Sequence, residues 1–192
     1  ATGLYCGEQD MFCFLIDPTG WAEIDGEAFA PGFFLWNSEV GAKSFGICTF
    51  LYDYVCGNHY VWGATNVQTF RLRHVGELMG NKAQRELESQ VRSYSLSSAA
   101  SVEEQIKRAQ RLLLGKDKDE AVESALNKRI NGLTRGRLEK AFDIAEATTR
   151  YGDPRSLWGI VSGLTELSQA SKNTDSRVDD DEAAGKLMKL VF

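Results

Sequence analysis

Residues 44–56 restrict the fold of this chain more than any other segment, because they carry apolar side chains on both faces of a strand. Successive side chains of a strand point to opposite faces, so Ile47 and Leu51 share one face while Phe50 and Tyr52 share the other. A strand with two apolar faces is typical of the interior of a sheet that is covered on both sides. We therefore predict that residues 44–56 form an interior strand with one neighbour on each edge.

Shorter strand patterns surround this segment. The apolar run 11–16 ends at Asp17-Pro18-Thr19-Gly20, a sequence typical of turns. Further strand patterns cover residues 21–24, 33–36, 60–62 and 67–74. Together they predict a curved antiparallel sheet built from the part of the chain before about residue 76.

The chain changes character after residue 76 and shows helix patterns. Good helix formers fill residues 77–92, and Ser101 with Glu104 fits a capping box that opens a second helix. Asp153 followed by Pro154 predicts the start of a later helix. The other predicted elements are helices at 119–130, 134–149 and 182–192 and a polar loop at 168–181.

This order of elements predicts the fold class and the domain organisation. Strands followed by helices are typical of α+β proteins and not of alternating α/β folds. A chain of 192 residues suits one domain, so we expect a sheet region at 1–76 and a helical region at 77–192 that share one core. The first residues are already strand-like and lack an initiator Met, so we also expect the chain to be a fragment of a longer protein.

The cysteines and the hydropathy predict the compartment. Cys6, Cys13, Cys48 and Cys56 contain no C-x-x-C spacing and are too few for a disulfide scaffold. No apolar run reaches the roughly 20 residues that a membrane helix needs. We therefore expect four reduced, mostly buried thiols in a cytoplasmic protein that is not inserted in a membrane.

The charges are divided unevenly along the chain. Residues 1–70 carry one cation, Lys43, against eight carboxylates, whereas residues 71–150 carry sixteen cations against twelve carboxylates. The net charge of −5 therefore conceals a basic middle segment between acidic ends. A local basic surface of this kind is compatible with polyanion binding even in an acidic protein.

Two groups of residues in and beside this basic segment are candidates for nucleic-acid binding. Arg71 and Arg73 share one face of a predicted strand, close to the aromatic residues Tyr60 and Trp62. Cations beside aromatic rings can follow a phosphate backbone and stack bases. The second group lies within thirteen residues that hold a single acid, and consists of Lys128, Arg129, Arg135, Arg137 and Lys140. We expect the cations of both groups to converge on one positive surface, formed by Arg71, Arg73, Lys128, Arg129, Arg135 and Arg137. The alternative for both groups is a solvated surface on which the cations pair with nearby acids.

Sequence patterns for catalysis and for cofactor binding are missing. Gly41-Ala42-Lys43-Ser44 lacks the first glycine of a phosphate-binding loop. His59 and His74 lie at a predicted turn and at a strand end, where an exposed imidazole is ordinary. The acidic run 179–182 lacks the alternating spacing of a calcium loop and is expected to precede a helix. We predict no catalytic residue, no metal site and no cofactor.

Several short motifs, in a fixed order, resemble a known family. They are Asn37-Ser38-Glu39-Val40-Gly41, Tyr54-Val55-Cys56-Gly57-Asn58, Arg71-Leu72-Arg73-His74-Val75-Gly76, Leu157-Trp158-Gly159 and Leu164-Thr165-Glu166. Together they resemble the domain-of-unknown-function family 932 of phages and plasmids over roughly residues 30–190. The chain departs from the family pattern at Gly57, and at Gly163 and Ala170, where we expect polar side chains. The resemblance implies a mobile-element origin and a host cytoplasm, and it implies no activity.

These observations lead to two functional hypotheses. A curved sheet backed by helices has the general architecture of single-strand annealing and binding proteins, which is an analogy of fold alone. With the basic segment, it predicts a non-catalytic, homo-oligomeric protein that binds single-stranded nucleic acid in recombination or replication. The alternative is a protein-interaction module that uses the acidic first third against a host factor, for example in anti-defence.

Overall fold

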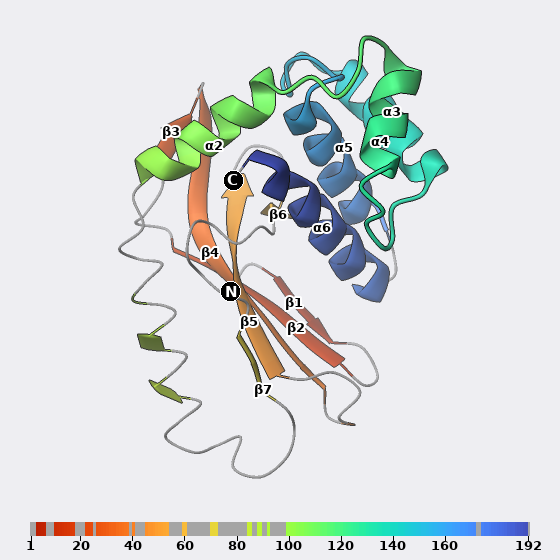
Figure 1. The fold of residues 1–192 in the computed structure, drawn as a ribbon. Helices are drawn as coiled ribbons and strands as arrows, with labels where there is room; N and C mark the ends of the chain where they lie inside the picture. The colour runs from red at the N-terminus through yellow and green to blue at the C-terminus, as the bar shows by residue number, and fades with distance from the viewer. Residues whose placement is uncertain are drawn as a thin grey trace.

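The chain folds into an antiparallel sheet followed by helices, so the predicted α+β class is confirmed (Figure 1). The computed structural model describes residues 3–6, 10–17, 22–24, 26–38, 40, 45–53, 59–60, 70–72, 84–85, 88–89, 92, 99–171 and 174–191. The strands are β1 (Gly3–Cys6), β2 (Asp10–Ile16), β3 (Ala22–Ile24), β4 (Glu27–Ser38), β5 (Phe45–Asp53), β6 (His59–Tyr60) and β7 (Phe70–Leu72). The helices are α2 (Ala99–Arg111), α3 (Lys118–Leu126), α4 (Arg135–Glu146), α5 (Leu157–Gln169), α6 (Thr174–Met188) and the 3₁₀ helix η1 (Lys189–Val191).

Strand β5 is an interior strand, as its two apolar faces predict. It pairs with β4 along one edge and with β6 and β7 along the other, and every pairing is antiparallel. The path through the sheet is β1-β2-β4-β5-β6, with β3 also paired to β4 and β7 to β5. Both faces of β5 contribute buried side chains, with Ile47 and Leu51 on one face and Phe50 on the other.

Two glycine–aromatic pairs fix the register between β4 and β5. Gly32 lies opposite Phe50, and Gly46 lies opposite Trp36. A Cβ atom at Gly32 would lie 2.4 Å from the Phe50 ring, and one at Gly46 would lie 2.0 Å from the Trp36 ring. The glycines therefore leave room for two buried rings. Because a slip of one residue would move every side chain to the other face, these pairs specify one alignment of the strands.

Helix α2 differs from the prediction at its start. Helix α2 begins at Ala99 and already contains Ser101, so the predicted capping box is wrong. The Glu104 carboxylate instead pairs with Arg108 one turn later, at 2.5 Å. Of the predicted helix 77–92, residues 84–85, 88–89 and 92 are helical, and the rest lies outside the described residues.

The start of α5 is also a correction. Its N-cap is Ser156, whose hydroxyl accepts a hydrogen bond from the Gly159 amide at 2.9 Å. The predicted cap at Asp153 is wrong, because that carboxylate accepts hydrogen bonds from the amide and the guanidinium of Arg155. Asp153 and Pro154 therefore belong to a turn that precedes the helix.

Residues 168–181 have a polar sequence that predicts a loop, yet most of the described ones are helical. Helix α5 extends to Gln169 and α6 begins at Thr174, so the acidic run 179–182 lies inside α6 and does not precede a helix. Arg137 of α4 donates to Asp180, and Ser168 of α5 donates to Asp181. Both carboxylates are buried, and burial is tolerated when a buried charge has a partner of this kind.

The hydrophobic core includes side chains of the sheet and of the helices. Phe29 and Leu51 from the sheet belong to the same buried cluster as Leu157 and Trp158 from α5. The rings of Phe29 and Trp158 meet edge to face, with 6.2 Å between their centres. Such aromatic contacts add stability beyond the buried area.

Arg150 connects the helices to the sheet. It lies in the connection between α4 and α5. Its Nε donates to Glu27 of β4, and its Nη2 donates to Asp53 of β5 at 3.3 Å. Asp53 is fully buried, and a buried carboxylate without a partner would be strongly destabilising.

The structure bears only in part on two predictions, the four reduced thiols and the absence of a membrane-spanning helix. Cys13 of β2 is a free, half-buried thiol, whereas Cys56 and the side chains of Cys6 and Cys48 lie outside the described part of the chain. Among the helices that the structure describes, none is both long enough and apolar enough to cross a membrane.

Candidate nucleic-acid interface

Helices α3 and α4 form a hairpin in which each helix has a side-chain cap. The Asp117 carboxylate accepts a hydrogen bond from the Glu120 amide at 2.9 Å, and the Thr134 hydroxyl accepts one from the Arg137 amide at 3.4 Å. Short polar side chains at this position satisfy amides that the first turn of a helix leaves unbonded. The connection between the helices runs from Asn127, the C-cap of α3, to Thr134, the N-cap of α4.

The larger predicted basic group lies at this connection and at the start of α4. We call it the basic tip, defined as Lys128, Arg129, Arg135, Arg137 and Lys140. Two residues in the connection have left-handed backbone conformations, Arg129 with φ 52° and Gly132 with φ 90°. Glycine adopts this conformation freely, whereas a residue with a Cβ atom is disfavoured by about 1 kcal/mol. The connection therefore holds an exposed arginine at a position where glycine would be less strained.

Two of the five cations of the basic tip are held by carboxylates. Arg135 pairs with Glu123 of α3, and Arg137 pairs with the buried Asp180 of α6 at 2.5 Å. These pairs partly neutralise the two guanidinium groups, as the alternative of a paired surface predicts. Their structural effect is to hold the hairpin closed and to attach it to α6.

The other three cations are available to a ligand. Lys128, Arg129 and Lys140 are exposed, and within the described part of the chain they form no ion pair. A Cβ atom at Gly136 would meet no atom within 4 Å, so the surface one turn before Lys140 is open. The basic tip therefore offers three cations without described ion pairs, two in the connection and one on α4.

The second predicted group does not join the basic tip. Arg71 lies on β7 and Tyr60 on β6, and only their backbone is described, whereas Arg73 and Trp62 lie outside the described residues. Figure 1 shows β7 at the lower end of the sheet, and α3 and α4 at the upper right of the molecule. Strand β7 with Arg71 therefore lies on a separate part of the fold from the basic tip, so the expected convergence of Arg71 with the basic tip is not seen.

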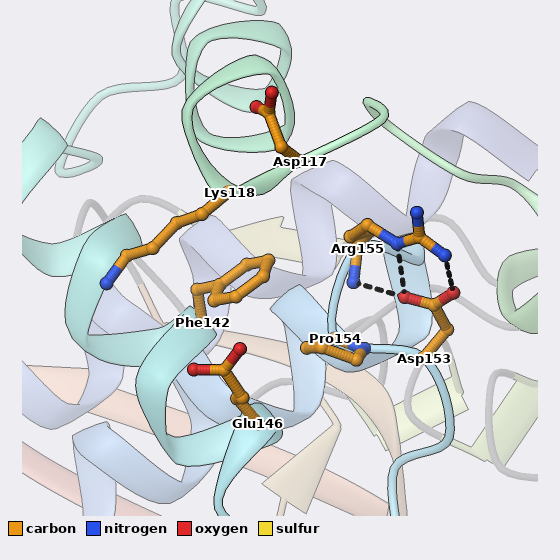
Figure 2. A pocket seen from close by; sticks show the side chains of 7 residues that line it. All are labelled: Asp117, Lys118, Phe142, Glu146, Asp153, Pro154 and Arg155. Atoms are coloured by element: carbon orange, nitrogen blue, oxygen red, sulfur yellow. Dashed lines mark hydrogen bonds and ion pairs between the residues drawn. The ribbon is translucent and has the colours of Figure 1, made fainter.

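An open hollow lies at the other end of the α3–α4 hairpin (Figure 2). Its volume is about 560 Å³, within the range of roughly 300–1,000 Å³ that is common for ligand sites. We call it the acidic hollow. It is lined by Asp117 and Lys118 from the start of α3, by Phe142 and Glu146 from α4, and by Asp153, Pro154 and Arg155 from the turn before α5.

The cations of the acidic hollow are already engaged. Arg155 pairs with Asp153 at 2.6 Å, and its Nη1 donates to the Lys116 carbonyl oxygen at 2.9 Å. The hydrogen bonds from Arg155 lower the pKa of Asp153, and the same pair raises the pKa of Arg155. Both groups therefore stay charged at neutral pH.

Lys118 is engaged as well, because its ammonium group donates to Asp143, and this bond raises the pKa of Lys118. Glu146 is exposed and forms no ion pair with any described residue. The charge that the hollow leaves unpaired is therefore negative. Sequence patterns do not predict this site, because its residues come from three separate segments, and only the Asp153–Arg155 spacing hints at a local ion pair.

A metal site is not found among the described residues. No group of three or more His, Cys, Asp or Glu side chains there could hold a metal ion. The acidic run 179–182 contributes two buried carboxylates, and each of these accepts a hydrogen bond from another helix.

The comparison with protein families decides which family this chain represents. The family model described as Domain of unknown function (DUF932) matches residues 18–191. The chain belongs to this family. The DUF932 match begins before the resemblance found in the sequence and extends to the end of η1. No curated protein and no solved structure matches the chain.

The structure explains one of the two helix positions that depart from the DUF932 pattern, Gly163, and not the other, Ala170. A Cβ atom at Gly163 would lie 2.0 Å from the carbonyl oxygen of Ala141, so α4 and α5 pack with their backbones in close approach. Only glycine leaves room for that carbonyl. Ala170 is the C-cap residue of α5 and is exposed, and nothing in the structure explains the absence of a polar side chain there.

Proposed function

We propose that this protein is a non-catalytic, nucleic-acid-binding protein that contacts the phosphate backbone through the basic tip. The observation that supports this proposal is the set of three exposed cations, Lys128, Arg129 and Lys140, which form no ion pair with described residues. Lys128 and Arg129 follow the C-cap of α3, and Lys140 lies on α4. A surface that offers lysines and an arginine without aromatic side chains would bind the backbone independently of sequence.

The number of free cations sets the expected strength of binding. Each phosphate contact on a single strand lowers log K by about 0.7 for each tenfold rise in salt, so three contacts give a slope of about −2. Non-specific affinities of this kind lie at about 10⁻⁴ to 10⁻⁶ M at physiological salt. We therefore propose that the protein binds single strands weakly and independently of sequence, in recombination or replication of a phage or plasmid in the host cytoplasm.

A salt-dependent titration tests the proposal. Fluorescence anisotropy with a labelled oligothymidylate should give a slope of about −2 for the wild-type protein. The variant K128A/R129G/K140A should lose binding at all salt concentrations, because it lacks the three free cations. Glycine is chosen at position 129 because φ there is 52°, so this change does not strain the connection.

The matched control removes the same charge elsewhere. The variant R111A/K116A/K189A lacks three exposed cations that lie on α2, on the segment before α3 and on η1. It should bind like the wild-type protein. No binding by the wild-type protein at 20 mM salt, or equal losses in both variants, would contradict the proposal and favour the protein-interaction alternative.

A further inference from the structure

The α3–α4 hairpin carries opposite charge at its two ends. The helices run antiparallel, since Lys118 at the start of α3 meets Asp143 near the end of α4, while Arg135 at the start of α4 meets Glu123. The connection with the basic tip is therefore at one end, and the acidic hollow at the other. The lining of the hollow has three carboxylates, Asp117, Glu146 and Asp153, against two cations, Lys118 and Arg155.

The acidic hollow has the composition that accepts a long basic side chain. Figure 2 shows the Phe142 ring and Pro154 between Asp117 and Glu146. Phe142 is buried and Lys118 already lies over its ring, 5.7 Å from the centre, so half-buried Pro154 supplies the apolar surface next to the carboxylates. The stems of lysine and arginine pack on apolar surface while their heads stay close to a counter-charge. The cations of the hollow itself do not neutralise its unpaired carboxylate Glu146, because Lys118 pairs with Asp143 and Arg155 pairs with Asp153.

We infer that the acidic hollow binds the basic tip of a second copy of this chain. The occupant is chosen by charge complementarity: the tip presents exposed cations without ion pairs, and the hollow presents exposed carboxylates. Because the two surfaces lie at opposite ends of one hairpin, the contact is head-to-tail. A contact of this type continues from copy to copy and closes into a ring or extends into a filament.

The inference does not depend on nucleic-acid binding, although both use the basic tip. Exposed charges attract each other over a Debye length of about 10 Å at 0.1 M salt, so the association should weaken as salt is added. Nucleic acid and a second copy should also compete for Lys128 and Arg129. Single-strand binding should therefore be measurable in a variant whose hollow is blocked.

Sedimentation velocity on blocked variants tests the inference. At 20 mM salt, the mass of the wild-type protein should rise with concentration beyond twice the chain mass of 21.3 kDa, and it should return to 21.3 kDa at 0.5 M salt. The hollow variant E146K and the tip variant K128A/R129G, which is neutral so that it cannot pair with the new lysine, should each remain monomeric. Their equimolar mixture should form dimers and nothing larger, because one intact hollow then meets one intact tip.

The control E23K reverses an exposed carboxylate on β3 and should associate like the wild-type protein. Melting temperatures verify that the variants are folded. A wild-type protein that stays monomeric at low salt, a blocked variant that still associates, or a mixture that stays monomeric would each overturn the inference. Binding of oligothymidylate by monomeric E146K separates the two proposals, because this variant keeps the basic tip.

Discussion

The interactions that fix the arrangement of strands within the sheet differ from those that fix the arrangement of helices within the helical region. In the sheet, apolar side chains and two glycine–aromatic pairs decide the register. In the helical region, capping side chains, ion pairs between helices and the close approach of α4 to α5 decide the arrangement. A contact in the sheet can accommodate a larger side chain when an aromatic ring shifts. A contact between the helices can do so only when the backbone shifts or an ion pair breaks.

This contrast has an energetic meaning. Apolar contacts lose stability in proportion to the area or volume that is disturbed. A buried ion pair that loses one partner leaves a charge uncompensated, which costs several kcal/mol. We therefore expect the protein to be most sensitive where a charged contact joins the two regions, and less sensitive inside the sheet.

The largest expected effect is at Arg150, which joins both regions. Arg150→Ala leaves the buried carboxylate of Asp53 without this guanidinium partner and should lower the free energy of unfolding by about 3 kcal/mol. Urea denaturation at pH 7 measures the change. Arg111→Ala, an exposed cation at the end of α2, serves as the control and should change stability by less than about 0.5 kcal/mol. Equal losses would mean that the regions are joined by apolar contact alone.

A pair of glycine substitutions compares the two regions directly. A methyl group at Gly163 or at Gly46 would in each case lie 2.0 Å from its nearest neighbour, a backbone carbonyl oxygen of α4 in the first case and the Trp36 ring in the second. Gly163→Ala should cost about 3 kcal/mol, because α4 must shift as a unit, and Gly46→Ala about 1 kcal/mol, because a ring can tilt. Thermal unfolding of both variants decides the order. The reverse order would show that the sheet is the more rigid region.

The smallest expected effect is a change in the pH dependence of stability, caused by loss of the Asp153–Arg155 ion pair in the acidic hollow. The pKa of Asp153 is lowered by Arg155, so its contribution to stability is present above the ordinary pKa of an aspartate, about 3.9, and is lost as the pH falls through the lowered value. Asp153→Asn should therefore reduce stability at pH 7 and approach the wild-type value as the pH falls below about 4. Denaturation at several pH values measures this. An equal gap at all pH values would assign the loss to packing.

The sequence predicted the sheet better than the helix ends, for a physical reason. Alternate residues of a strand face opposite sides of the sheet, so apolar residues at both sets of positions show that both faces are buried. Such a strand belongs in the sheet interior, and β5 lies between β4 on one edge and β6 and β7 on the other. Helix ends depend on which polar side chain finds an unbonded amide, so Ser156 and not Asp153 caps α5. The acidic run in α6 has the composition of a loop, and its hydrogen bonds from Arg137 and Ser168, 43 and 13 residues away in the sequence, help to make it compatible with a buried helix.

The sequence also predicted the candidate site in part: it shows the cluster of basic residues, but neither their ion-pair partners nor the acidic hollow. The clustering of cations at 128–140 is visible in the sequence, because these residues are near one another along the chain. That Arg135 and Arg137 are engaged by Glu123 and Asp180 depends on partners 12 and 43 residues away. The acidic hollow combines three segments and has no linear pattern at all.

The Arg150 contact also has a consequence for the order of folding. Its partners Glu27 and Asp53 precede it by 123 and 97 residues, and contacts between such distant residues form late and slow the folding of a domain. During synthesis the strands leave the ribosome long before Arg150 and α5 follow, so the Phe29 and Leu51 side chains stay uncovered in the meantime. A nascent sheet with exposed apolar surface and strand edges is prone to aggregation, and release of a chain that ends before residue 150 should yield insoluble protein.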